Sequence, residues 1–214
     1  EGKLEIKDLS FKQGRFYLPL DKANAKIHME GNAAVIDYFD VLVGHSDLHV
    51  DGTVDDLPAI LHHSDKIVDC KLNISSKLID LAELTAQRGT IDTTKKDNPV
   101  DEQFRNLRMK LELKSSAKAI TESKYLPEGE LFIEDMFVDL KHYPHTLHDF
   151  HADIFRDEND LRVVDFSGMI DKSDFHFHGK LHEYGFWFSE SLVGDTRVDY
   201  DLTCDHLRLE DLFA

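Results

Sequence analysis

The chain repeats itself at a fixed offset of 127 residues. Gly2–Leu9 returns as Gly129–Met136, and Ser46–Gly52 returns as Ser173–Gly179, with no gap between the two matches. Over the 51 aligned positions from Gly2 to Gly52, 13 residues are identical, where average residue usage gives roughly 3. A duplicated unit of this kind is typical of a stacked or extended array, whose working surface belongs to the array and not to one pocket.

Apolar and polar residues alternate along much of the chain. The clearest alternating segments are 23–29, 47–51, 107–113 and 174–178. Strict alternation predicts strands with one apolar and one solvated face, as in an antiparallel sheet. Further strands are expected at 33–43, 68–75, 160–171 and 197–203. The sequence therefore predicts a mostly-β fold, in which duplicated antiparallel strand units form an extended, twisted, groove-like sheet with a few short helices.

Turn and helix signals divide this pattern. Tight turns are expected at Gly31-Asn32, Gly44-His45 and 157–159. Short helices are expected near 57–62, where Pro58 takes a first-turn position, and at 80–88. We assign 1–88 to the first β repeat, 89–105 to a polar loop, and 106–214 to the second β repeat.

The alternation slips once in each repeat. Leu4 and Ile6 are out of phase with Leu9, and the second repeat shows the same slip. A residue inserted at Asp8, and at Asp135 in the second repeat, explains this either as a β-bulge or as a bend between two strands.

Charge excludes one class of partner. The chain has 42 acidic and 25 basic residues and a formal net charge of −17. Such a surface repels phosphate, which argues against nucleic acid as a partner and against binding flat on anionic headgroups. No apolar run approaches the ~20 residues of a membrane helix, and no signal peptide is visible. Because the chain opens within a strand pattern, we interpret it as a fragment of a longer protein.

Cysteine and histidine residues suggest little chemistry. Two cysteines, Cys70 and Cys204, do not make a disulfide scaffold, so we expect two unpaired, partly buried thiols. A zinc-binding set would share one strand face: Asp174, His176, His178 and His182. Residues two apart on a strand are ~7 Å apart, however, and a solvated face needs polar residues anyway. We therefore predict no functional metal. No catalytic motif is present, and we expect no enzyme activity and no cofactor.

Three recurring phrases resemble the AsmA family of bacterial envelope proteins. They are the Gly-x-Leu-x-Ile-x-Asp opening of each unit, the Ser-Asp strand that ends at Gly52 or Gly179, and the endings Leu81–Leu84 and Leu209–Leu212. The resemblance implies a long periplasmic β-sheet and an inner-membrane anchor outside this fragment. It also implies an apolar groove that carries phospholipid between membranes, envelope-protein partners, and a role in outer-membrane assembly or biogenesis.

Two functions remain open from the sequence. One is a lipid-conducting or envelope-assembly module with an accessible apolar face. The other is a structural or protein-interaction β-repeat module whose apolar face is closed by its own side chains. The residues expected to face lipid in the first case are Ala25, Ile27, Leu48, Val50, Ile154, Phe175 and Phe177.

Overall fold

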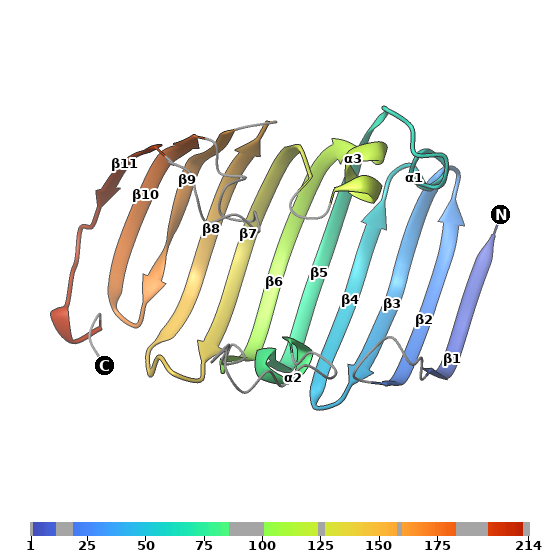
Figure 1. Cartoon of the computed structure of the whole chain (residues 1–214), viewed down its shortest axis with the longest axis horizontal. Helices are drawn as coiled ribbons and strands as arrows, with labels where there is room; N and C mark the ends of the chain where they lie inside the picture. The colour runs from blue at the N-terminus through green and yellow to red at the C-terminus, as the bar shows by residue number, and fades with distance from the viewer. Residues whose placement is uncertain are drawn as a thin grey trace, which may run out of the picture.

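One open antiparallel sheet forms the body of the protein. The computed structural model describes residues 2–11, 19–85, 101–123, 127–157, 160–182 and 197–211. Eleven strands pair in chain order from β1 to β11, and the sheet does not close on itself. Figure 1 shows these strands lying side by side across the whole molecule. The predicted mostly-β, antiparallel fold is therefore confirmed.

The elements follow the alternating segments of the sequence. The strands are β1 (Lys3–Phe11), β2 (Leu20–Glu30), β3 (Ala33–Val43), β4 (Ser46–Val54), β5 (Ile67–Asp80), β6 (Gln103–Ser116), β7 (Gly129–Leu140), β8 (Thr146–Arg156), β9 (Asp160–Ile170), β10 (Ser173–His182) and β11 (Arg197–Thr203). The helices are α1 (Leu57–Leu61), α2 (Leu81–Thr85), α3 (Ala117–Glu122) and the 3₁₀ turn η2 (Leu209–Asp211). Within the described residues, no helix is long and apolar enough to cross a membrane.

The duplication in the sequence is a duplication of strand register. Ala25 pairs with Phe39, and their counterparts Ala152 and Phe166 pair with each other. The irregularities are copied too. The shift between Lys26 and Ile27 recurs 127 residues later on β8, between Asp153 and Ile154. Ser46–Gly52 and Ser173–Gly179 thus occupy equivalent strands, β4 and β10, as the gapless offset predicts.

Both predicted slips and two of the three predicted turns are present; the third turn, at 157–159, falls partly outside the described residues. The pairing of β1 with β2 shifts between Ile6 and Leu9, and Asp8 between them has a φ of 50°. On β7 the shift against β6 leaves Glu134, next to Asp135, without a partner in the register. Both slips are therefore bulges inside a single strand. Two-residue turns join β2 to β3 and β3 to β4, with Gly31 and Gly44 at φ of 64° and 58°.

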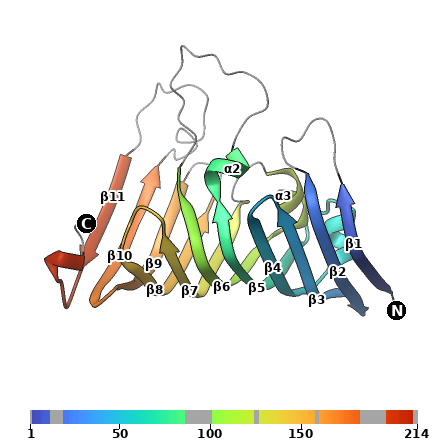
Figure 2. The ribbon, with the colours of Figure 1, turned by 90° about the horizontal axis from the view of Figure 1, so that it is seen from below.

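Three short helices lie beyond the strand ends. Figure 1 shows α2 at the opposite end of the strands from α1 and α3, and Figure 2, seen from below, shows α2 at the end nearer the viewer. Asp56 caps α1 by accepting a hydrogen bond of 3.0 Å from the backbone N–H of Ala59. Ala59 and Ala117 bring α1 and α3 onto Val68 and Cys70 of β5, which forms a small buried core.

One helix and two boundaries differ from the sequence prediction. The sequence does not predict α3, because its six residues show no helical period and, unlike 57–62, contain no proline that marks a first turn. Ser116 caps α3, and Ala117 is fully buried. Strand β6 begins at Gln103, inside the segment 89–105 assigned to a loop. Helix α2 begins at Leu81, since Asp80 still belongs to β5, and the described part of this helix ends at Thr85. Residues 86–100 lie outside the described part.

Candidate functional site

An unbroken apolar row crosses all eleven strands. Residues paired across neighbouring antiparallel strands point to the same face of a sheet, so the register defines the row directly. One residue per strand, from β1 to β11, contributes to it: Leu4, Ile27, Ile36, Gly52, Leu72, Leu111, Ile133, Ala152, Phe166, Phe177 and Leu202. None of the eleven carries a polar side chain. At a strand spacing of about 4.8 Å the row is about 48 Å long.

Flanking rows widen this row, on one side from β1 to β7 and on the other from β3 to β11. The first flanking row is Ile6, Ala25, Phe39, Val50, Ile74, Met109 and Met136. The second is Ala34, Val54, Cys70, Leu113, Leu131, Ile154, Val163, Gly179 and Tyr200. We call the central row with its two flanking rows the apolar strip.

Away from α1 and α3, the described residues form no second layer over the large side chains of the apolar strip. Ile27, Leu72 and Leu111 are half-buried although they lie inside the sheet. Ala25, Ala34 and Ala152 are buried, because a methyl group is shielded by its neighbours alone. Among the described residues, α1 and α3 cover the strip at the Val54–Cys70–Leu113 end. Away from α1 and α3, the strip offers apolar surface to a ligand.

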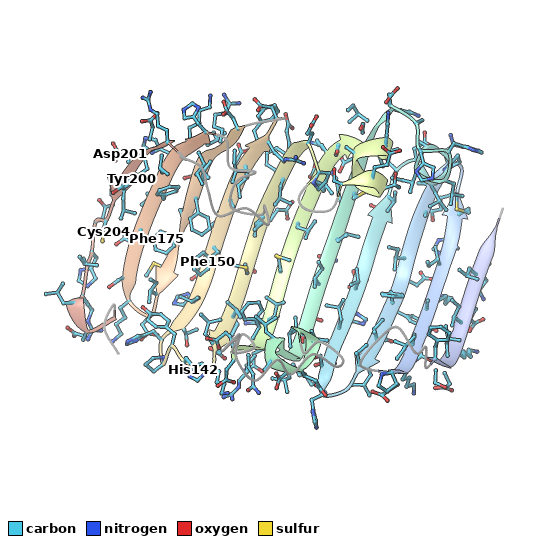
Figure 3. The ribbon with its side chains drawn as sticks, viewed as in Figure 1. His142, Phe150, Phe175, Tyr200, Asp201 and Cys204 are labelled. Atoms are coloured by element: carbon cyan, nitrogen blue, oxygen red, sulfur yellow. The ribbon has the colours of Figure 1, made fainter. Side chains whose placement is uncertain are left out.

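Three phenylalanine rings fill part of the same face on the second repeat. The ring centroids of Phe150, Phe166 and Phe175 lie 5.5 to 5.6 Å apart. Figure 3 labels Phe150 and Phe175 on neighbouring parts of the sheet. Phe150 is 4% exposed, and Gly168 makes this possible, since a Cβ there would meet the Phe150 ring at 2.8 Å. Here the chain's own side chains cover the sheet.

The register places all seven predicted lipid-facing residues on one face. Ala25, Ile27, Val50, Ile154 and Phe177 lie in the apolar strip; Leu48 pairs with Val41, and Phe175 with Gly168, beside it. The seven residues come from β2, β4, β8 and β10, so the prediction did not include the contributions of the other seven strands, β5 and β6 among them. For β6 the signal was available, because 107–113 is one of the clearest alternating segments of the chain.

The opposite face is polar, and pairs of histidine and aspartate run along it. His28 lies 3.3 Å from Asp37, and His49 contacts Asp40. Aromatic rings on this face lie beneath cations: the Arg108 guanidinium is 4.7 Å above the Phe137 ring, and similar contacts join Lys114 to Phe132 and Arg162 to Phe155. This arrangement shields the rings without a second layer.

The four residues considered for zinc do not converge. They are Asp174, His176, His178 and His182. The Asp174 carboxylate accepts hydrogen bonds from the backbone N–H groups of residues 205–206, and His182 instead lies 3.2 Å from Asp160. No group of three or more metal-ligating side chains forms within the residues that the structure describes.

The recurring Ser-Asp phrase is a structural clasp. The Asp47 carboxylate accepts hydrogen bonds from the backbone N–H groups of Lys77 and Leu78, at 3.0 and 2.9 Å. The Ser46 hydroxyl accepts one from Asp80 N–H at 3.0 Å. In the second repeat Asp174 binds the N–H groups of residues 205–206, and Ser173 accepts from Arg208 N–H at 2.8 Å. These hydrogen bonds lower the pKa of Asp174.

A cleft of about 440 Å³ lies on the polar face over β4 to β8. Asp51, Asp135 and Asp149 line it together with Arg108 and Lys110. The cleft is lined by charges of both signs, so it favours neither an anionic nor a cationic ligand. The cleft therefore does not identify a class of ligand.

The two cysteines are unpaired, as the sequence predicts, but their environments differ. Cys70 is buried beneath α1 and α3, and burial raises its pKa to about 11. Such a thiol stays protonated at neutral pH and is a poor nucleophile. Cys204 is exposed, so the expectation of two partly buried thiols is wrong for both residues.

Comparison of the chain with protein-family models, with curated proteins and with solved structures finds no match. The assignment of function therefore depends on the geometry of the sheet and on the sequence phrases.

Proposed function

We propose that this chain is a non-enzymatic, lipid-holding segment of an envelope protein that resembles the AsmA family. Phospholipid acyl chains lie along the apolar strip, and the parent protein acts in the periplasm, in outer-membrane assembly or in phospholipid transport between membranes. A membrane anchor outside this segment and envelope-protein partners belong to the same proposal. The observation that carries it is the central row, which crosses eleven strands without one polar side chain.

The dimensions of the strip suit acyl chains. A bilayer's hydrocarbon core is about 30 Å thick and holds two acyl chains end to end. A row of about 48 Å is thus long enough for about three chains in line. Each CH2 group moved from water onto the strip contributes about 0.8 kcal/mol. A polar interruption would remove that contribution locally and leave a polar group unsolvated.

The net charge of the chain bears on the headgroup of a bound lipid. With a net charge of −17, the chain repels anionic headgroups more than zwitterionic ones. We therefore propose zwitterionic phospholipid as the preferred class, with the acyl chains on the strip and the headgroup outside it.

A closed structural or protein-interaction module is the second candidate. The cluster of Phe150, Phe166 and Phe175 favours it, because these rings already cover their part of the sheet. Under this alternative the exposed part of the strip binds protein or stays in water, and no lipid is held.

Replacing Phe177 by aspartate tests the proposal. Phe177 lies in the central row, and its ring stacks on Tyr200 at 6.0 Å. A carboxylate beside acyl chains loses its hydration, so Phe177→Asp is expected to reduce co-purifying phospholipid about tenfold or more. Native mass spectrometry of the intact chain measures the bound lipid.

The matched control is His178→Asp, on the next residue of β10. It adds the same charge on the opposite, solvated face and is expected to leave lipid binding unchanged. Tyr200→Asp provides a second strip variant with little risk of unfolding, since Tyr200 is 67% exposed. If wild type holds no lipid, or if all three variants lose it equally, the closed-module candidate is preferred.

A further inference from the structure

In the second repeat an aromatic ring fills one place beside the apolar strip. The Phe150 ring packs against Phe166 and Phe175, at centroid distances of 5.6 and 5.5 Å (Figure 3). It also lies over Gly168, where a Cβ would meet the ring at 2.8 Å. Phe150 is therefore able to fill this place only because residue 168 has no side chain.

The first repeat has a different set of side chains at the equivalent place. The counterparts 127 positions earlier are Ala23 for Phe150, Phe39 for Phe166, Val41 for Gly168 and Leu48 for Phe175. Val41 lies opposite both Ala23 and Leu48, so the three share one face of the sheet. A methyl group stands where the second repeat has a ring, and Phe39 beside it is 37% exposed although β3 lies inside the sheet. This place therefore presents apolar surface in the first repeat.

The ring of the second repeat indicates which chemistry fits this place. We propose that an acyl chain of the bound phospholipid lies over Ala23, Val41 and Leu48, where the second repeat has the Phe150 ring. We call this place the acyl subsite. The inference rests on the proposed function, and it adds a binding position beside the central row that only the first repeat offers. A phenyl ring is a hydrocarbon group without polar atoms, and the acyl chain is the part of a phospholipid that shares this character.

Two pairs of residues decide whether the acyl subsite is open. The second repeat combines a large side chain, Phe150, with none at Gly168, whereas the first combines a small one, Ala23, with the branched Val41. A valine at 168 would collide with the Phe150 ring, so the members of a pair are exchanged together. Exchanges that conserve total volume are the ones that a packed surface tolerates best.

Exchanging the pairs between the repeats tests the inference. Ala23→Phe with Val41→Gly closes the acyl subsite of the first repeat, and Phe150→Ala with Gly168→Val opens one in the second. Each pair already occurs at the equivalent positions of the other repeat, so both exchanged chains are expected to fold, which circular dichroism checks. Lys22→Phe is the matched control, because it adds a ring to the opposite face of β2 next to Ala23.

Photo-crosslinking reports where the acyl chain lies. A benzophenone amino acid replaces Val43 or Ile170, equivalent residues that lie two positions beyond Val41 and Gly168 on the same face. The intact chain is irradiated with phosphatidylcholine that is labelled in its acyl chain. Capture at Val43 is expected to exceed capture at Ile170 about tenfold, which corresponds to the burial of roughly two CH2 groups.

The exchanged chains are expected to remove this difference in opposite ways. Closing the acyl subsite lowers capture at Val43, opening the second one raises capture at Ile170, and Lys22→Phe changes neither. If one exchanged chain does not fold, the other decides, together with the ratio in the unchanged chain.

Capture at Leu111 of the central row separates this inference from the proposed function. Capture at Leu111 with equal capture at Val43 and Ile170 contradicts the acyl subsite alone. A difference between Val43 and Ile170 that persists in both exchanged chains also contradicts it. No capture at any of the three positions contradicts both the acyl subsite and the proposed function.

Discussion

Gly52→Ala is expected to lower the free energy of unfolding by about 3 kcal/mol. Gly52 lies in the central row with a φ of 146°, a conformation that L side chains rarely adopt. A Cβ at this position would lie 2.0 Å from the Lys71 carbonyl oxygen of β5. The clash is with backbone, so it is relieved only by separating β4 from β5. Urea-induced unfolding of the intact chain, followed by circular dichroism, measures the loss.

Two other glycines distinguish the cost of a positive φ from the cost of a steric clash. Gly31→Ala also places a side chain at positive φ, but no atom lies within 4 Å of its Cβ, and the expected loss is about 1 kcal/mol. Gly179→Ala, at the equivalent position of the second repeat, meets the Asp199 carbonyl oxygen at 2.7 Å and is expected to fall between the two. Equal losses at Gly52 and Gly31 would contradict the close approach of β4 and β5.

Asp47→Ala is expected to cost about 2 kcal/mol, since hydrogen bonds to a charged group contribute 1.5 to 3 kcal/mol. The change leaves the N–H groups of Lys77 and Leu78 without their acceptor. Amide hydrogen exchange at these two residues is expected to accelerate, and the exchange of β1 and β2 is expected to stay unchanged. Asp47→Asn keeps one carboxamide oxygen as an acceptor, and its expected loss of unfolding free energy is about half as large. Unchanged exchange at Lys77 and Leu78 in Asp47→Ala would contradict the clasp.

The clasp at Asp174, in the second repeat, makes the stability of the fold depend on pH. Backbone hydrogen bonds from residues 205–206 lower the pKa of Asp174 below its ordinary value of 3.8. A lowered pKa in the folded state means that the stabilisation is fully present above pH 3.8 and is lost as the pH falls through the lowered value. Asp174→Asn is expected to remove this part of the acid sensitivity.

Strand alternation and the repeat made most of the fold predictable. Each strand has one solvated face, so its period of two is legible in the sequence, and β3 and β11 match their predicted bounds. The Ser-Asp phrase was visible as a repeat, but its role was not, because its partners Lys77 and Leu78 lie about thirty residues away. A side-chain-to-backbone contact across that distance leaves no local period.

The continuity of the apolar strip could not be predicted either. Bulges at Asp8 and Glu134 decide which residues face each other across strands, and a shift of one residue reverses a face. The sequence indicates that each repeat contains a slip. Only the paired register shows that the row stays apolar across the slip. Leu111 therefore continues the row into Ile133, and no polar residue interrupts it there.

Photo-crosslinking along the strip tests the central claim most directly. A benzophenone amino acid is placed at Ile27, Leu111 or Phe177 of the central row, and at Lys110 on the solvated face next to Leu111. The intact chain is irradiated with zwitterionic phospholipid that is labelled in its acyl chain. We expect labelled lipid to be captured at all three strip positions and not at Lys110. Capture at Lys110 as efficient as at Leu111, or capture at none of the strip positions, would contradict an apolar strip that holds lipid.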